Sequence, residues 1–216
     1  MAVEEASEKS GVNIQFVNVG IAGQHIKSLQ HRGSLIRNTS DEEISPADIK
    51  KLHSSMYNLA MNPGEEIIDV IPQEFIIDGQ EDVREPIGMS GLRLEVKVHI
   101  VTGAVSAAQN IVKCVRRCGL EVNDLILQPL ASSLAVLTED EKELGVVLID
   151  IGGGTTDIAI YSQGSIRHTA VIPIAGDQIT NDIAMALRTP TIEAEDLKIH
   201  HGVARQELAD ATAMID

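Results

Sequence analysis

Two apolar segments of the chain are joined by the sequence Asp150-Ile151-Gly152-Gly153-Gly154-Thr155-Thr156-Asp157. The flanking segments, residues 146–149 and 158–161, are short and rich in β-branched residues, which predicts two buried strands. Gly-x-x-x-x-Gly-Lys is absent, and the element expected after the glycines is a strand, not a helix. These two features exclude a Walker loop and the Rossmann pattern, so the turn belongs to another kind of phosphate loop or to none.

Each residue type in this turn has a use in binding a polyphosphate. Gly152, Gly153 and Gly154 are expected to take positive φ and to turn their N–H groups inward as an anion nest. The hydroxyls of Thr155 and Thr156 would add donors. Asp150 and Asp157 would repel a bare phosphate, so we expect them to hold Mg²⁺, directly or through water. The alternative is a plain β-hairpin turn, although tight hairpins prefer Asn-Gly or Asp-Gly.

Composition narrows the class of protein. The chain has 216 residues, of which 44% are hydrophobic and 23% charged, and its formal net charge is -15. This composition indicates a globular protein, and no apolar run approaches the roughly 18 residues of a membrane span. The negative charge argues against nucleic acid as a partner. The first residues do not resemble a signal peptide, so we expect a cytoplasmic protein.

Cysteines and histidines give no sign of a metal site. Cys114 and Cys118 are four residues apart on one face of a predicted helix, without further ligands nearby, and buried reduced thiols are the simpler interpretation. His200 and His201 point to different sides of any helix. We therefore expect Mg²⁺ at the glycine-rich turn and no other metal.

Residues 24–102 are predicted to fold as a strand, a helix and two further strands. Residues 11–23 form a strand before this unit, and residues 24–40 a strand or hairpin. Ser45 is the expected N-cap of a helix that begins at Pro46, with Asp48 near its positive end. Strands follow at 66–78 and 92–101, where alternate residues from Leu92 to Ile100 share one face.

An α/β alternation is predicted for the rest of the chain. A helix at 105–118 is followed by a strand at 124–128 and a helix after Pro129. A third strand at 165–173 follows the glycine-rich turn, and helices cover 177–187 and 192–201. Residues 1–10 and 203–216 look loosely specified. The predicted fold class is therefore α/β, with an inserted α+β unit.

The pattern Asp-x-Gly-Gly-Gly-Thr-x-Asp between strands resembles the second phosphate loop of the actin, hexokinase and DnaK-type chaperone superfamily. Within that superfamily, several stretches between about residues 13 and 204 resemble the FtsA family of bacterial cell-division proteins. These stretches are Val70-Ile71-Pro72-Gln73-Glu74-Phe75, Gly88-Met89-Ser90-Gly91, Lys97-Val98-His99, Asn110-Ile111-Val112-Lys113, Leu137-Thr138-Glu139-Asp140-Glu141, Arg167-His168-Thr169 and Ile172-Pro173.

The resemblance implies a fragment of an actin-like (ribonuclease H-like) fold. It divides the chain into a first-lobe strand remnant (1–23), an inserted 1C-type, SHS2-like subdomain (24–102), the remainder of the first lobe (103–145) and the start of the second lobe (146–216). The family's first phosphate loop has a carboxylate and a hydroxyl where Asn18-Val19-Gly20-Ile21 has amide and methyl groups. We therefore expect that loop, the late adenosine motif and the membrane helix to lie outside this chain.

Four further site residues follow from the resemblance alone. Gln128 matches the position that orients the hydrolytic water, and otherwise is an ordinary polar residue at a strand end. Glu195 and Lys198 match a pair that contacts the adenosine sugar, or form a solvated i,i+3 ion pair. Gly176 resembles part of a loop near the nucleotide cleft.

The resemblance also implies a function. FtsA proteins bind ATP with Mg²⁺, polymerise, and join the FtsZ ring to the cytoplasmic face of the membrane at the division site. The complete protein would be at most a slow ATPase, and this fragment would be inactive. Other division proteins would contact residues 24–102, and the membrane would be bound only through a C-terminal helix absent here.

Two alternatives come from the same superfamily. A small-molecule kinase would need a sugar-binding cluster of Asp, Asn and Trp, and Trp is absent from the chain. A pilus-assembly or chaperone relative would share the loop but should lack the FtsA-like stretches.

Overall fold

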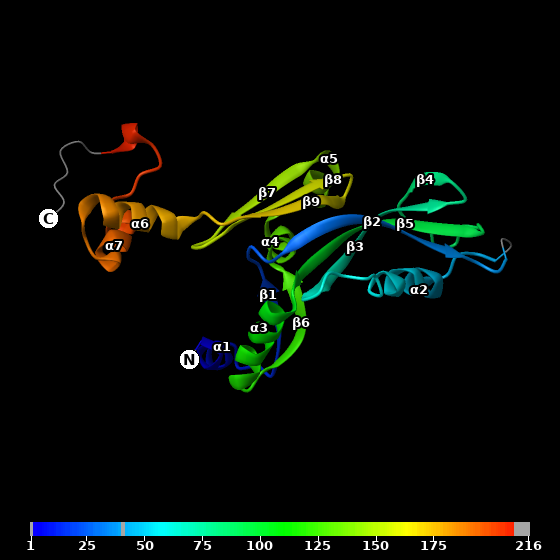
Figure 1. Ribbon diagram of the computed structural model, residues 1–216, viewed down its shortest axis with the longest axis horizontal. Helices are drawn as coiled ribbons and strands as arrows, with labels where there is room; N and C mark the ends of the chain where they lie inside the picture. The colour runs from blue at the N-terminus through cyan, green and yellow to red at the C-terminus, as the bar shows by residue number, and fades with distance from the viewer. Residues whose placement is uncertain (1, 40–41, 210–216) are drawn as a thin grey trace.

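The computed structural model describes residues 2–39 and 42–209, in which the strands form three separate sheets (Figure 1). The first is a parallel pair, the second a four-stranded antiparallel sheet in the order β2-β5-β3-β4, and the third an antiparallel meander in the order β7-β8-β9. The strands are β1 (Phe16–Ile21), β2 (Lys27–Ile36), β3 (Glu65–Ile77), β4 (Gln80–Val83), β5 (Arg93–Ala104), β6 (Glu121–Leu127), β7 (Val146–Ile151), β8 (Thr156–Ser162) and β9 (Ser165–Ile172).

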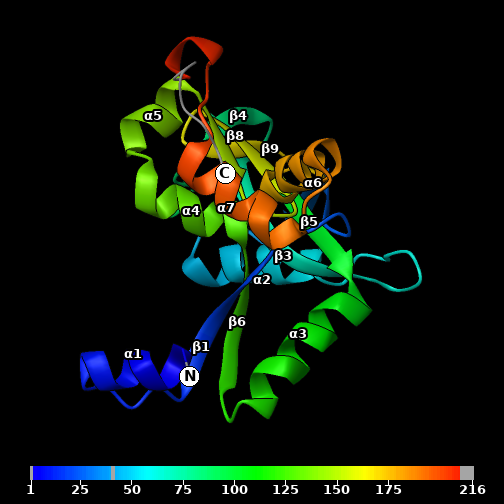
Figure 2. The same cartoon turned by 90° about the vertical axis from the view of Figure 1, so that its left-hand side faces the viewer.

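The helices are distributed among these sheets. Helix α2 packs on the second sheet, whereas α6 and α7 lie together at the far end of the molecule, beyond β7 and β9 (Figure 1). The parallel pair β1–β6 extends away from the other sheets with α3 beside it (Figure 2). The helices are α1 (Ala2–Ser10), α2 (Pro46–Met56), α3 (Val105–Arg117), α4 (Gln128–Val136), α5 (Glu139–Leu144), α6 (Gly176–Leu187), α7 (Thr191–His201) and the short 3-10 helix η1 (Gln206–Leu208).

The second sheet has its own apolar core. The alternate residues Leu94, Val96, Val98 and Ile100 of β5 are all buried, and they pack against α2 through side chains such as Leu52. Leu92 was expected on this face, but it precedes the strand and is 42% exposed. Because β5 is paired on both sides and these alternate residues fill a core with α2, the sheet forms a unit by itself.

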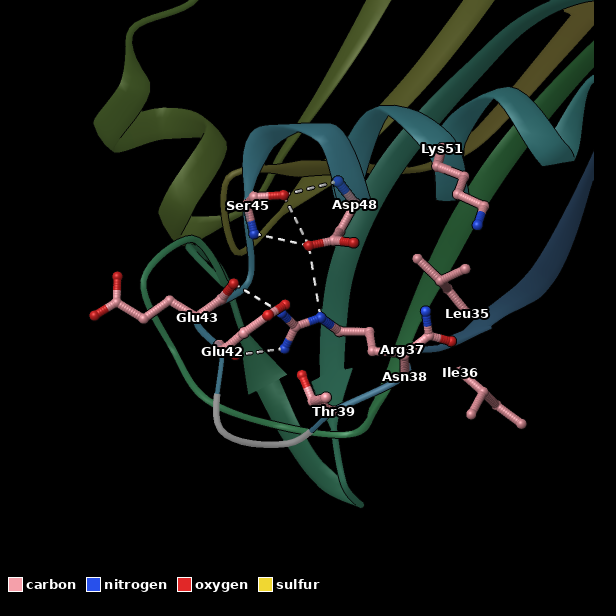
Figure 3. Close-up of a pocket in the computed structure, with 10 residues that line it drawn as sticks. All are labelled: Leu35, Ile36, Arg37, Asn38, Thr39, Glu42, Glu43, Ser45, Asp48 and Lys51. Atoms are coloured by element: carbon pink, nitrogen blue, oxygen red, sulfur yellow. Dashed lines mark hydrogen bonds and ion pairs between the residues drawn. The ribbon is translucent and has the colours of Figure 1, made fainter.

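Ser45 is the N-cap of α2, as expected, and Asp48 completes a capping box that was not predicted. The Ser45 hydroxyl accepts from the backbone N–H of Asp48, and the Asp48 carboxylate accepts from the Ser45 N–H at 2.9 Å. Arg37 braces the loop before the cap by donating to the carbonyls of Glu42, Glu43 and Gly91 (Figure 3). The Arg37 side chain is almost fully buried and lies 3.5 Å from the Asp48 carboxylate. One buried guanidinium therefore joins the loop at residues 42–43 to Gly91 and to the start of α2.

Pro72 lies inside β3, although a proline cannot donate to a central ladder. The register between β3 and β5 shifts between Pro72 and Glu74, which marks a β-bulge. Bulges are among the few places in a sheet that tolerate proline. The loose alternation predicted around Pro72 thus reflects an irregularity of the strand.

A polar seam joins the second sheet to the third. Buried His99 contacts Gln30 and Thr169 at 3.0 Å each, and Gln30 also donates to the Arg167 carbonyl at 2.9 Å. The Gln30 amide nitrogen is a donor, so His99 Nδ1 accepts and its Nε2–H donates to Thr169. We call His99, Gln30 and Thr169 the His99 seam. It fixes the second sheet against β9.

Several expectations about elements were wrong or incomplete. Of the two alternatives for residues 24–40, a strand or a hairpin, the described residues 24–39 form the strand β2. Strand β4 and helix α5 were not predicted because they are short, and α1 lies in residues 1–10, which were expected to be loosely specified. Cys114 and Cys118 are free, as expected, but exposed, because α3 turns that face to solvent. Residues 203–216 were expected to be loosely specified; residues 206–208 form η1, and residues 210–216 lie outside the described residues.

No helix among the described residues is long and apolar enough to cross a bilayer. Within residues 2–39 and 42–209, no group of three or more His, Cys, Asp or Glu side chains is arranged to hold a metal ion by itself.

Candidate nucleotide site

The glycine-rich turn closes a hairpin between β7 and β8. The N–H of Gly152 donates to the carbonyl of Thr155 at 2.9 Å, which leaves four residues in the loop. Asp150 and Asp157 are direct cross-strand partners in this hairpin. Their side chains therefore project from the same face of the sheet, beside the loop.

Close packing explains Gly153, and a left-handed backbone explains none of the three glycines. None of Gly152, Gly153 and Gly154 has a positive φ, so the expected reason for them was wrong. A Cβ on Gly153 would lie 3.1 Å from Asp177 Oδ1. The carbonyls of Gly152 and Gly153 accept from the N–H groups of Gly176 and Asp177 at 3.0 and 2.8 Å. The loop and the start of α6 thus pack backbone to backbone, which side chains would prevent.

The loop keeps backbone donors available. Among the described residues, the N–H groups of Gly153 and Gly154 have no hydrogen-bond acceptor. A Cβ built on Gly154 would meet no atom within 4 Å, so one side of the loop is open. Unpaired N–H groups on an open glycine loop are suited to an anion.

The two carboxylates lie at the root of the loop with two hydroxyls. Ser132 of α4 donates to Asp150 Oδ2 at 2.7 Å, and Thr155 donates to Asp157 Oδ2 at 3.0 Å. Asp157 is only 4% exposed, and its Oδ1 has no partner within the described part of the chain. Burial, and secondarily the charge of Asp150, raise the pKa of Asp157. A buried carboxylate oxygen without a partner, beside a second carboxylate and hydroxyls, fits the oxygen ligands of Mg²⁺.

Thr156 faces away from this pair. It alternates with Asp157 along β8, so its side chain projects from the opposite face of the sheet. Its hydroxyl donates to the carbonyl of Ile174 at 2.7 Å. The structure therefore brings Thr155, but not the hydroxyl of Thr156, to the carboxylates.

Gly176, Glu195 and Lys198 lie together next to the loop. Lys198 Nζ is 2.7 Å from the Glu195 carboxylate, 2.8 Å from Thr180 Oγ1 and 3.2 Å from the Gly176 carbonyl. Hydrogen bonds from Lys198, and then from Thr180, lower the pKa of Glu195. The i,i+3 ion pair between Glu195 and Lys198, one of the two alternatives, is therefore present. Lys198 also bonds to Gly176, which packs on the phosphate loop.

A hollow of about 510 Å³ adjoins these helices. Its lining residues are Asp177, Thr180, Asn181, Thr191, Ile192 and Glu195. Glu195 lines the hollow and also contacts Lys198. Lys198 bonds to the Gly176 carbonyl, and the Gly176 N–H bonds to Gly152 of the loop.

Gln128 is the first residue of α4, where a strand end was expected. It is exposed, and it precedes Ser132 by four residues, so both side chains lie on one helix face. No contact joins Gln128 to the carboxylates among the described residues. Gln128 lies one helical turn before Ser132, whose hydroxyl donates to Asp150.

Sequence reasoning missed Ser132, Asp177 and Thr180 as neighbours of the site. An acidic residue in the first turn of a helix needs no binding role, so Asp177 gave no signal in the sequence. Serines in a short apolar helix are common, so Ser132 gave none either. Only the fold shows that one serine of the pair Ser132–Ser133 reaches a carboxylate on another element.

Comparison with known proteins gives one consistent family. A model described as "SHS2 domain inserted in FTSA" matches residues 23–102, and one described as "Cell division protein FtsA" matches residues 147–216. The chain is 59% identical over 210 residues to cell division protein FtsA of Pseudomonas aeruginosa, covering 97% of the chain and 50% of that protein. It is 44% identical over 203 residues to the Escherichia coli K12 protein of that name, covering 94% and 48%. The chain thus spans about half the length of the curated relatives it matches.

A solved structure titled "PilM-PilN type IV pilus biogenesis complex" aligns with 93% of this chain and 55% of its own, with a TM-score of 0.65 and 15% identity. At that identity the likeness concerns the fold alone. The fold is α/β and actin-like, as expected from the loop.

Proposed function

Because the chain belongs to the FtsA family of cell-division proteins, we propose that it carries the second phosphate loop of an actin-like protein that binds ATP with Mg²⁺. In this proposal the N–H groups of Gly153 and Gly154 donate hydrogen bonds to phosphate oxygens. Asp150 and Asp157 hold Mg²⁺ through water, which supplies positive charge between the phosphates and the two carboxylates. Glu195 and Lys198 face the adenosine sugar at the neighbouring hollow.

One observation carries the proposal most directly. Asp157 is buried with an unpartnered oxygen at the base of a loop that has free N–H donors. A plain hairpin turn gains nothing from a buried, unpaired carboxylate, because such a group costs free energy unless a partner binds it. A magnesium–nucleotide complex supplies both the cation and the anion that these groups lack.

The remaining roles concern the whole protein. We propose that a protein of the relatives' length polymerises and links the FtsZ ring to the membrane, with slow hydrolysis at most and Gln128 orienting the water. Residues 24–102 would then offer contacts to other division proteins. The FtsA names of the sequence relatives support this role over a small-molecule kinase or a pilus-assembly protein.

The test of ATP binding is a substitution at Gly153 in the full-length protein. Gly153→Val would drive its side chain into Asp177, because the Cβ alone would lie 3.1 Å from Oδ1. Displacing α6 from the loop should weaken ATP binding at least tenfold, as measured by isothermal titration calorimetry with Mg²⁺.

Gly20→Ala is the control, since a Cβ there would meet no atom within 4 Å and Gly20 lies on β1, in a different sheet from the loop. We expect it to bind ATP like the wild type. Equal affinities for Gly153→Val and the wild type would refute the assignment of the loop.

A further inference from the structure

Two adjacent serines of α4 have different partners. Ser132 Oγ donates to Asp150 Oδ2 on β7 at 2.7 Å, whereas Ser133 Oγ donates to the Leu130 carbonyl of its own helix at 2.8 Å. Ser133 is 2% exposed and its bond stays within one turn. Only the Ser132 bond connects this helix to a residue of the phosphate-loop hairpin.

The Ser132 bond acts on one defined oxygen of Asp150. A hydroxyl has one proton to donate, and a carboxylate held by it at one oxygen loses rotational freedom. Asp150 Oδ1 receives no hydrogen bond from the described residues. The free oxygen is therefore the one available to a metal-bound water, and Ser132 sets the direction in which it points.

The same bond couples the two ends of the site. Helix α4 begins with Gln128, and β7 ends at the glycine loop. The Ser132 bond therefore holds the first turns of α4 beside the strand that leads into the loop. The hydrogen bond to a charged acceptor is stronger than one between neutral groups. A displacement of the hairpin relative to α4 would have to break it.

We infer that Ser132 is a positioning residue for metal-dependent nucleotide binding, acting through the Asp150 carboxylate. This inference rests on the proposed ATP and Mg²⁺ site and adds a residue to it. Ser132 itself touches neither the phosphates nor the reacting atoms in this assignment.

The experiment compares Ser132→Ala with Ser133→Ala in the full-length protein. ATP affinity is measured by titration calorimetry in Mg²⁺ and again in EDTA. We expect Ser132→Ala to weaken binding about five- to tenfold in Mg²⁺ and to match the wild type in EDTA. Ser133→Ala should match the wild type in both, and Ser132→Thr, which keeps the hydroxyl, should restore most of the Mg²⁺-dependent affinity.

The outcomes separate this inference from the function on which it rests. If the wild type binds Mg·ATP and Ser132→Ala binds it equally well, the role of Ser132 is wrong and the site stands. An equal loss in Mg²⁺ and EDTA, or a failure of Ser132→Thr to restore affinity, would make Ser132 a structural residue only. A wild type that binds no ATP in either condition overturns both. Thermal unfolding in EDTA without nucleotide checks that the serine variants are folded.

Discussion

At the scale of single residues, the site contains one group whose burial opposes stability. Asp157 is 4% exposed, lies across from Asp150 and has an oxygen without a partner in the described structure. Its pKa is raised in the fold above the unfolded value. Folding therefore disfavours the charged form, and above the unfolded pKa this carboxylate lowers the free energy of unfolding. Such costs are typical of residues kept for binding.

We predict that Asp157→Asn stabilises the nucleotide-free protein and impairs binding. Removing the buried charge should raise the free energy of unfolding by about 1 kcal/mol at pH 7. Mg²⁺-dependent ATP affinity should fall at least tenfold, because a carboxylate is lost. Denaturant unfolding in EDTA and calorimetry with Mg·ATP measure the two effects.

Asp182→Asn is the control for both measurements, because Asp182 is exposed on α6 and its bond from Gln178 can go to an amide oxygen as well. It should change neither stability nor affinity. A less stable Asp157→Asn protein with unchanged affinity would mean that the carboxylate is structural.

Residue chemistry could be predicted where a local rule decides it. The Ser45 N-cap of α2 and the place of Asp48 in its first turn could be predicted, and the structure has both. The partners of Asp150 and the contact of Gly153 with Asp177 could not be predicted, because they join segments that are far apart in the sequence. The glycines of the loop were expected for their φ angles, whereas the structure shows close packing against α6 at Gly153 and no positive φ at any of the three.

At the scale of elements, the His99 seam holds the inserted sheet on β9. His99 is 1% exposed, and burial, with a smaller effect of His168, lowers its pKa to about 4. The neutral tautomer is required, because an imidazolium would present an N–H to the Gln30 amide donor. As pH falls from about 6.5, the unfolded chain binds this proton first, so the stability from neutral His99 is lost down to about pH 4.

We predict that His99→Leu lowers the free energy of unfolding by about 1–3 kcal/mol at pH 7.5, because Gln30 and Thr169 lose a buried partner. The difference from the wild type should shrink as pH falls from 6.5 to 4. Denaturant unfolding at a series of pH values measures the difference. Taking the difference between the two proteins cancels the effect of carboxylate titration, which both proteins share.

His201→Leu is the control, since His201 is exposed on α7. Its difference from the wild type should be small at every pH. A His99→Leu deficit that stays constant between pH 7.5 and 4 would contradict the buried neutral histidine.

Elements with strong periodicity were predicted well, and short polar ones were not. The strands β5, β7 and β8 follow from alternating or continuous apolar residues. Strand β4 has four residues and buries only Val83, so it carries almost no pattern. The capping box of Thr138 and Glu141 could have revealed α5, although six residues are few for a helix.

At the scale of the whole molecule, the three sheets meet near β9 while α6 and α7 extend beyond them (Figure 1). The second sheet is built by residues 27–104, close to the expected insert at 24–102. The division into a first-lobe remnant, an insert, a remainder and a second lobe stays a prediction for the full-length protein. The His99 seam links the second sheet to β9, and the ion pair between Arg84 and Glu143 links residues next to that sheet to α5.

The central claim is that the loop from Gly152 to Gly154 holds the phosphates of ATP. The most direct measurement is an experimental structure of the full-length protein with Mg²⁺ and a non-hydrolysable ATP analogue. We predict phosphate oxygens within hydrogen-bond distance of the Gly153 and Gly154 N–H groups, with Mg²⁺ or its waters against Asp150 and Asp157. A nucleotide bound elsewhere, with these N–H groups and carboxylates facing only solvent, would contradict the account.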